Sequence, residues 1–266
     1  MALSFGMPTL IENKDPDESA ALCRELGLDF IELNMNLPCY QTEQLCDTSR
    51  FLELAERNDI YFTIHLDENL NVCDFNRAVA KAYQETVKRT IGIAREIHAP
   101  VLNMHMNHGV HFTLPDRKVQ LFEQYKDNYM EDIRTFREMC EEVTGDSGIK
   151  ICIENTNGFR NYEQEAIGYL LESKVFGLTW DIGHSHSVEN VDEAFIMAHE
   201  KELSHFHIHD AVGSRDHMTL GTGEINLLQR LEIAKRYGCR CVVETKTVEA
   251  LRESVRWLGE NKCQSL

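Results

Sequence analysis

The chain has 266 residues, 42% of them hydrophobic, a length that fits one α/β barrel domain. Forty-four acidic residues against 27 basic ones give a formal charge of −17, which repels a phosphate backbone and makes a nucleic acid an unexpected partner. Nine cysteines without a CxxC pair, no leader-like amino terminus and no run of about 18 apolar residues indicate a soluble, cytoplasmic protein with reduced thiols and no membrane contact.

Short apolar runs alternate with helical patterns along the chain. The predicted strands cover residues 3–10, 29–36, 60–66, 100–106, 150–155, 177–181, 203–209 and 239–245. The predicted helices cover residues 16–27, 42–58, 77–97, 118–143, 162–173, 191–202, 227–237 and 251–260. Because strand and helix segments alternate with no linker between them, the sequence predicts an α/β fold, a single (β/α)8 TIM barrel domain over residues 1–266.

An open doubly wound sheet is the alternative arrangement of the same segments. Its nucleotide-binding version carries a GxGxxG or GxxxxGK[ST] loop before a helix, and neither pattern opens a predicted helix in this sequence. The barrel is therefore the favoured fold. In barrel enzymes the functional site lies at the carboxyl ends of the strands, so these ends are the place to look for chemistry.

Six of the predicted strands carry an ionisable residue near the carboxyl end. These residues are His65, His105, Glu154, Asp181, His207 and Glu244. Both faces of a buried parallel strand are normally apolar, so a polar position at a similar depth in so many strands needs a cause. A single histidine is more often a structural residue than a ligand. A glutamate inside ICIENT or CVVETK, by contrast, is rarely buried without a partner.

A bound cation is one such cause. Three carboxylates gathered inside a barrel do not all stay ionised cheaply, because burial and mutual repulsion both favour protonation. A divalent cation removes this difficulty. Carboxylate oxygens with imidazole nitrogens suit manganese, cobalt, zinc or magnesium, and the residue types leave the choice open. Cys152 lies one layer deeper than Glu154 on the same strand face, and we expect it to pack rather than to bind.

The stretch of residues 203–224 is the richest in candidate residues. In an extended strand His205, His207 and His209 point to one face. His207 lies at the level of the carboxylates, whereas His205 is one layer deeper and His209 one layer above. The long loop that follows adds Arg215 and His217, and loops of this kind at a barrel mouth commonly contact substrate.

Five short motifs occur in order at or just after strand ends: IEN, DIGH, HIHD, DHxxLGxGEI and VVET. Together they resemble the sugar isomerase/epimerase and AP endonuclease family of xylose isomerase-like TIM barrels, over the third to the eighth strand. The resemblance implies one divalent metal ion held by Glu154, Asp181, His207 and Glu244. It also implies that Glu154 and Glu244 are the acid/base pair that acts on a ketose or sugar phosphate through an enediolate. Isomerisation and epimerisation both fit.

The endonuclease IV branch of the family gives the main alternative, a multi-zinc phosphodiester hydrolase. Matches to its extra histidines remain, but Arg215 occupies the aligned place of an aspartate and Asp216 follows one residue later. This shift and the acidic charge favour the sugar enzyme. The residues expected to contact substrate or to hold a second metal are His65, His105, His184, His209, Arg215 and His217.

Two further alternatives use the same barrel. A metal-dependent lyase or dehydratase would pass through the same enolate, and a non-catalytic sugar-binding protein would keep the fold without the chemistry. Arg160 and Lys246 are candidate contacts for an acidic substrate group, and Glu32 and Asn34 for sugar hydroxyls. The expected partner is a small carbohydrate, and a homo-oligomer is expected by analogy alone.

Overall fold

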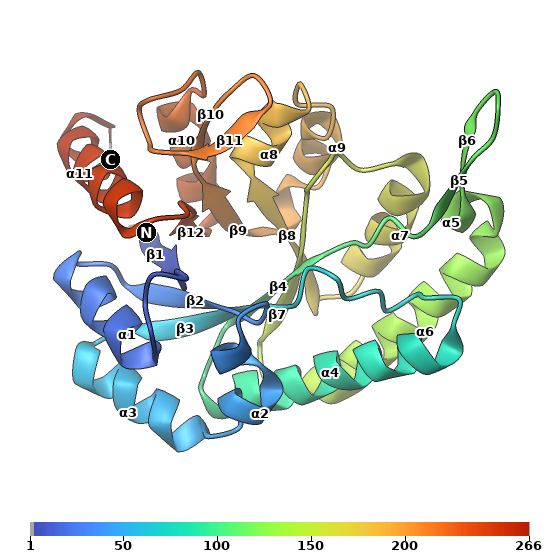
Figure 1. Ribbon diagram of the computed structural model, residues 1–266, viewed down its shortest axis with the longest axis horizontal. Helices are drawn as coiled ribbons and strands as arrows, with labels where there is room; N and C mark the ends of the chain where they lie inside the picture. Colours follow the sequence, from blue (N-terminus) through green and yellow to red (C-terminus); the bar gives the residue numbers. More distant parts are fainter. Residues whose placement is uncertain (1–2, 266) are drawn as a thin grey trace.

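The computed structural model describes residues 3–265, with side chains for residues 3–261. Eight parallel strands close into a barrel in the order β1, β12, β9, β8, β7, β4, β3, β2 (Figure 1). Their bounds are β1 Ser4–Pro8, β2 Phe30–Asn34, β3 Tyr61–His65, β4 Val101–His105, β7 Lys150–Glu154, β8 Phe176–Asp181, β9 Leu203–Ile208 and β12 Arg240–Val243. Each strand overlaps one of the predicted strands, so the (β/α)8 prediction is confirmed.

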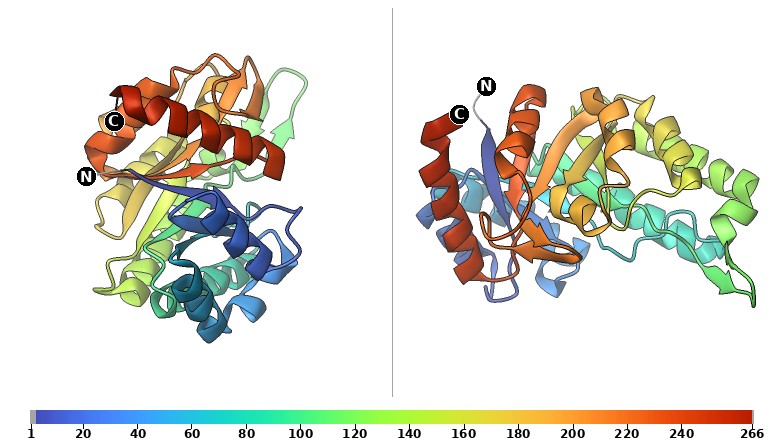
Figure 2. Two further views of the ribbon diagram at one scale, coloured as in Figure 1. Left: turned by 90° about the vertical axis from the view of Figure 1, so that its left-hand side faces the viewer. Right: turned by 90° about the horizontal axis from the view of Figure 1, so that it is seen from above.

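Helices form the outer layer of the molecule (Figure 2). The longer ones are α1 Pro16–Glu25, α3 Thr48–Asn58, α4 Arg77–Glu96, α6 Lys126–Thr144, α7 Asn161–Leu171, α10 Leu227–Tyr237 and α11 Val248–Ser265. Shorter ones are α2 Thr42–Leu45, α5 Leu121–Gln124, α8 Ile182–Ser187 and α9 Glu193–Ala198, with 3-10 turns η1 Pro38–Tyr40 and η2 Glu200–Glu202. No helix within the described residues is long and apolar enough to cross a membrane.

Three of the predicted helices each cover more than one element of the structure. The segment 42–58 divides into α2 and α3, and the segment 191–202 into α9 and η2. The first residues of segment 118–143 form β6 (Lys118–Gln120), which pairs antiparallel with β5 (His111–Thr113) in a projecting hairpin (Figure 1). These segments are charged and partly exposed, so their hydrophobic spacing carries little information about where a helix begins.

Burial on both faces explains why the strands read as nearly continuous apolar runs. In β8 every residue is buried. Trp180 is fully buried and packs against Phe206 of β9, with ring centroids 5.6 Å apart. Burying a large apolar side chain stabilises the folded state by roughly 1.5–3 kcal/mol. Packing of the outer strand faces against the helices therefore stabilises the barrel. The inner faces at the carboxyl ends are left free for polar residues such as Asp181.

The barrel closes between the first strand and the last one. Ser4, Phe5 and Gly6 of β1 pair in parallel register with Arg240, Cys241 and Val242 of β12. The two ends of the chain therefore lie on the same side of the molecule (Figure 2). This closure carries Glu244, directly after β12, to the same end of the barrel as the residues of β7, β8 and β9.

Candidate metal centre

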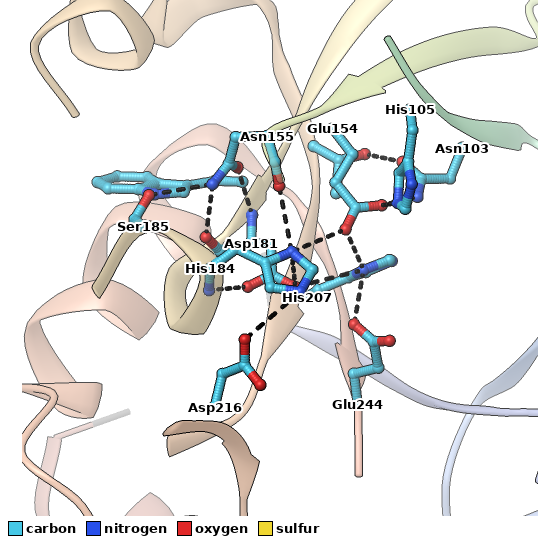
Figure 3. Close-up of polar contacts among 12 residues, drawn as sticks. Asn103, His105, Glu154, Asn155, Asp181, His184, Ser185, His207, Asp216 and Glu244 are labelled. Carbon is cyan, nitrogen blue, oxygen red and sulfur yellow. Dashed lines mark hydrogen bonds and ion pairs between the residues drawn. The ribbon is translucent and has the colours of Figure 1, made fainter. Parts of the chain in front are cut away.

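Strand register brings the predicted metal ligands to one level. His105 stands opposite Glu154 in the pairing of β4 with β7, and Asp181 stands opposite His207 in the pairing of β8 with β9. The backbone N–H of Glu244 donates to the carbonyl oxygen of Ile208 at 3.0 Å, which places Glu244 beside the end of β9. All four predicted ligands therefore meet at the carboxyl end of the barrel, as Figure 3 shows.

The Nδ1 atom of His207 faces three carboxylates. It lies 3.2 Å from Oε1 of Glu154, 3.0 Å from Oε2 of Glu244 and 3.8 Å from Oδ2 of Asp181. One ligand atom from each of these residues lies within 4.8 Å of every other. Tetrahedral ligands held ~2.1 Å from a zinc ion lie ~3.4 Å from one another, so the spacing of this group is already close to that of a metal site.

Unpaired buried atoms also support a missing ligand at this position. Nδ1 of His207 and Oε2 of Glu244 are buried and lie 3.0 Å apart, but neither atom is in a hydrogen bond of acceptable geometry. Leaving buried polar atoms unpaired costs about 1–3 kcal/mol each, and both atoms belong to the group that faces the common centre. The donor set of three carboxylates and one imidazole therefore fits a divalent cation.

Glu154 is in contact with further histidines. His65 Nε2 lies 3.3 Å and His105 Nε2 lies 3.2 Å from its Oε2, and His184 Nδ1 lies 3.6 Å from its Oε1. With His207 this makes a carboxylate surrounded by imidazoles, while its own side chain is only 1% exposed. The structure thus brings three of the residues expected to contact substrate or a second metal directly to the metal centre.

The electrostatics keep both glutamates ionised. Burial would raise the pKa of Glu154, but the charges of His207 and His105 outweigh it and hold the pKa well below its ordinary value. At Glu244 burial would also raise the pKa of the carboxyl, but the charge of His207 outweighs it and holds that pKa well below its ordinary value. At His184 burial would lower the pKa of the imidazole, but the charge of Asp181 outweighs it and raises the pKa to about 10.

A cavity of about 710 Å³ opens above this group. Its lining includes amides, hydroxyls and ionisable groups: Asn34, His65, Glu68, Asn69, His105, Asn107, His108, Glu154, Thr156, Asn157, His184, Ser187, Asp216, His217, Glu244 and Lys246. The volume falls in the range of ~300–1,000 Å³ that is usual for small-molecule sites. The Nζ atom of Lys246 lies 2.9 Å from Oε1 of Glu244, so one of the predicted cationic contacts reaches the cavity.

The loop after β9 forms a hairpin of β10 (Asp210–Val212) and β11 (Arg215–Met218) with an irregular register. His217 adopts a positive φ of 52°, which breaks the alternation of side chains in β11. Asp216 and His217 consequently both line the cavity. His217 Nδ1 lies 2.8 Å from Oδ1 of Asp216, and its Nε2 lies 3.5 Å from Oε1 of Glu244.

Arg215, one of the predicted substrate contacts, is not brought to the cavity. Arg215 is exposed and does not line the cavity. The bulge in β11 turns Asp216 inward in its place. The one-residue shift between Arg215 and Asp216 in the sequence therefore does not remove the aspartate from the site, so the shift does not count against a multi-metal centre.

His209 also has a different environment from the one expected. Its ring is fully buried and its Nδ1 accepts the backbone N–H of His217 at 2.7 Å. The other nitrogen, Nε2, therefore carries the proton and donates to Oδ2 of Asp181 at 3.0 Å. Gly183 permits this contact, because a Cβ there would lie 2.0 Å from the His209 ring. His209 orients Asp181 and does not face the cavity.

A buried aspartate anchors the loop that carries Asp216 and His217. The carboxylate of Asp210 is 1% exposed and accepts backbone N–H bonds from Gly221, Gly223 and Ile225 at 3.0, 2.8 and 3.2 Å. A Cβ at Gly223 would lie 2.4 Å from Oδ1 of Asp210, so the glycine lets the loop approach. The DHxxLGxGEI motif is thus held by the aspartate of the preceding HIHD motif.

We expect Asp210→Ala to lower the free energy of unfolding by about 3 kcal/mol, since several backbone N–H groups lose their acceptor. Urea denaturation followed by circular dichroism measures the change. Thr222→Ala is the matched control in the exposed part of the same loop, where the hydroxyl bonds only to Thr219, and should change the value by less than ~0.5 kcal/mol. Equal midpoints for wild type and Asp210→Ala would refute the anchoring role.

Sequence reasoning missed several residues beneath and beside the metal centre. Asn103 donates through Nδ2 to Oε2 of Glu154, and Thr179 donates to Oδ1 of Asn103 at 2.5 Å. Asn103 lies two residues before His105, so the alternation of the strand could have revealed it. Glu32, which was expected to contact sugar hydroxyls, is instead 2% exposed and lies below the cavity. Asn34 does line the cavity, as expected.

Arg160 and His108 converge on a buried glutamate of α7. His108 contacts Glu163 through Nδ1, and Arg160 Nη1 lies 3.5 Å from Oε1 of Glu163. The charge of Arg160 is therefore directed away from the cavity, which it does not line. A second cavity, of about 920 Å³, lies at the opposite end of the barrel beside Pro100 and Ile149. It is remote from the polar strand ends and holds none of the predicted site residues.

Comparison with known proteins places this arrangement in a family. A crystal structure of a D-tagatose 3-epimerase-like protein is 26% identical, covers 97% of this chain and 96% of its own, and superposes with a TM-score of 0.78. The apo 3-keto-D-glucoside 4-epimerase of E. coli has a TM-score of 0.77 at 14% identity, over 97% of this chain and 100% of its own. A zinc-bound IOLI protein has a TM-score of 0.76 at 15% identity, over 99% of both chains. The last two likenesses bear on the fold alone.

Sequence comparison agrees with the structural one. An uncharacterised protein of Methanocaldococcus jannaschii is 28% identical over 216 residues, which are 77% of this chain and 70% of that protein. The family pattern described as "Xylose isomerase-like TIM barrel" matches residues 20–261. That match spans most of the barrel, including the strands that carry the metal centre. The chain belongs to the xylose isomerase-like TIM barrel family.

Proposed function

We propose that this protein is a divalent-metal-dependent isomerase or epimerase that acts on a ketose, a sugar phosphate or a related carbonyl compound. The observation that carries the proposal is the group of Glu154, Asp181, His207 and Glu244, whose ligand atoms converge beneath an open polar cavity. The D-tagatose 3-epimerase-like protein of similar structure supports a sugar as the substrate. We take residues 1–266 as one domain that acts in the cytoplasm, and a homo-oligomer remains an expectation by analogy.

The two glutamates are the proposed acid/base pair. A bound divalent ion would polarise the carbonyl and hydroxyl oxygens of the substrate. One glutamate removes the proton on the carbon beside the carbonyl, which gives an enediolate, and the other returns a proton. Glu244 is the better placed to exchange protons with the cavity, because its side chain is 14% exposed whereas that of Glu154 is 1% exposed.

The polar lining supports a hydroxylated substrate. Asn34, Asn69, Asn107 and Asn157 all face the cavity, and an amide can donate to one hydroxyl while it accepts from another. Lys246 is the lysine of the lining, and its ammonium group is paired with Glu244. Free sugars and sugar phosphates therefore both belong in the panel of test substrates.

Proton exchange tests the proposal directly. The metal content of the purified protein is measured first, and the metal-loaded protein is then incubated with ketoses and sugar phosphates in heavy water. We expect NMR to show loss of a carbon-bound proton signal next to the carbonyl for at least one sugar, since the enediolate takes up solvent deuterium whatever product follows. Absence of exchange with every carbohydrate would overturn the isomerase proposal.

A multi-zinc phosphodiester hydrolase is the second candidate. The observation that favours it is a further group, His184, His209 and His217, whose ring nitrogens lie close together beside the proposed metal centre, although both nitrogens of His209 already have protein partners. Two or more zinc ions per chain together with cleavage of an abasic oligonucleotide would support it. The formal charge of −17 argues against a DNA substrate. A lyase or dehydratase would show proton exchange followed by loss of a group β to the carbonyl.

A further inference from the structure

A layer of buried polar side chains lies directly below the proposed metal ligands. Glu32 of β2 stands opposite Thr63 of β3, and both point toward β9 across the barrel. Oε1 of Glu32 makes an ion-pair contact of 2.7 Å with Nε2 of His207, outside hydrogen-bond geometry, and its Oε2 forms a hydrogen bond of 2.9 Å with Nε2 of His205. Thr63 donates to Oε2 of Glu32 at 3.2 Å. The carboxylate therefore bridges two imidazoles of the same strand.

This layer is costly, so its presence needs an explanation. Glu32 is 2% exposed, and Thr63, His205 and His207 are fully buried. A buried carboxylate that serves only to fill space would usually be replaced by an apolar side chain at little cost or with a gain in stability. Glu32 does not line the cavity above the metal centre. A role through its neighbours therefore explains its burial better than contact with a substrate.

We propose that Glu32 is a positioning residue for the metal centre, which holds the His207 ring by Nε2 so that Nδ1 faces Glu154, Asp181 and Glu244. The inference rests on the proposed function in one respect, namely that His207 binds the metal. It goes beyond that function because it assigns a task to a residue that touches neither substrate nor metal.

The geometry of the ring supports the assignment. The two nitrogens of an imidazole point in different directions in the ring plane, so a partner on one of them limits the directions open to the other. With Nε2 fixed by Glu32, Nδ1 lies 3.0–3.8 Å from the three carboxylates. Outer partners of this kind also fix which nitrogen carries the proton, and their loss commonly costs ~10–100-fold in metal affinity.

His205 secures Glu32 in turn, and Thr63 adds a longer contact of 3.2 Å. They occupy its second oxygen, Oε2, and leave Oε1 for His207. The four residues come from three strands, and their contacts cross the barrel interior below the cavity. The contact of Thr63 with Glu32 is the longest of the three, at 3.2 Å. A change at Thr63 therefore serves as the control for a substitution in this buried layer that leaves the contact between Glu32 and His207 in place.

Metal affinity is the measurement that tests the positioning role. Zinc dissociation constants are determined by competition with a chromophoric chelator for wild type, Glu32→Gln, Thr63→Val and His207→Gln. We expect a loss of ~10–100-fold for Glu32→Gln, a change of less than ~3-fold for Thr63→Val, and a larger loss for His207→Gln. Wild-type affinity in a folded Glu32→Gln protein would overturn the inference while leaving the metal site intact. Wild-type affinity in His207→Gln would instead overturn the metal assignment itself.

A second measurement needs no folded Glu32 variant. In zinc-loaded wild type with ¹⁵N-labelled histidine, the signals of His207 are assigned by their loss in His207→Gln. We expect a long-range proton–nitrogen spectrum in which Nε2 carries a proton and Nδ1 is bound to the metal. A pattern with Nδ1 protonated and Nε2 bound would mean that Glu32 does not hold the ring, and would overturn the inference.

Discussion

Replacing Glu154 by glutamine should reduce the rate of substrate proton exchange by ~10²–10⁴-fold, the range usual for loss of a general acid or base. Glutamine keeps the size of the side chain and its bond to Asn103, so the barrel should still fold. It cannot take up a proton. Glu244→Gln should have an effect of similar size, since the proposed mechanism uses both carboxylates.

The matched control is Glu68→Gln. Glu68 lines the same cavity, but its carboxylate bonds to Asn36 at the rim, so we expect less than a ~3-fold change. Rates are measured by NMR in heavy water at saturating metal, with metal content and circular dichroism recorded for each variant. If Glu154→Gln or Glu244→Gln keeps its metal and exchanges protons at nearly the wild-type rate, the acid/base assignment is wrong.

Removing the metal should abolish exchange, and restoring a divalent ion should return it. Asp181→Asn is expected to weaken metal binding by at least ~100-fold, because a charged ligand is lost at the centre. Asp192→Asn is a suitable control, since Asp192 is equally buried but bonds to Ser185 behind the site. Undiminished exchange by the metal-free protein would contradict the proposed chemistry.

Metal affinity should also rise with pH. Burial lowers the pKa of His207, but the charges of Glu154 and Glu32 outweigh it and hold the pKa well above its ordinary value. In the metal-free protein the ring is therefore protonated at neutral pH, and a metal must displace that proton from Nδ1. The apparent affinity should gain about tenfold per pH unit between about pH 6 and pH 8. Competition titrations across that range measure the slope, and a flat profile would contradict it.

The barrel was predictable because its evidence is local. Each strand is a short apolar run covered on both faces, and six of the runs carry an ionisable residue near the carboxyl end. Helix bounds were less predictable where the surface is charged. In residues 118–120, for example, the choice between helix and hairpin depends on pairing with residues 111–113, which no hydrophobic period records.

The residue types at the strand ends also determined most of the candidate site. Glu154, Asp181, His207 and Glu244 follow from one polar position per strand together with a family resemblance, and the structure brings them together. Their roles remain a proposal until metal and exchange are measured. Strand alternation predicted that His205 and His207 share one face, where both meet Glu32, because the side-chain period of a strand does not depend on tertiary contacts.

The tertiary structure alone decided what lies around that group. A positive φ at His217 shifts the hairpin by one residue and turns Asp216 inward while Arg215 stays outside. Closure of the barrel brings Glu32 to His207, although 175 positions separate them in the sequence. Local periodicity specifies which face a side chain occupies, whereas strand order and loop conformation decide which distant side chain it meets. The sequence by itself therefore determined the barrel and the ligand types, and the packing across the barrel decided their partners.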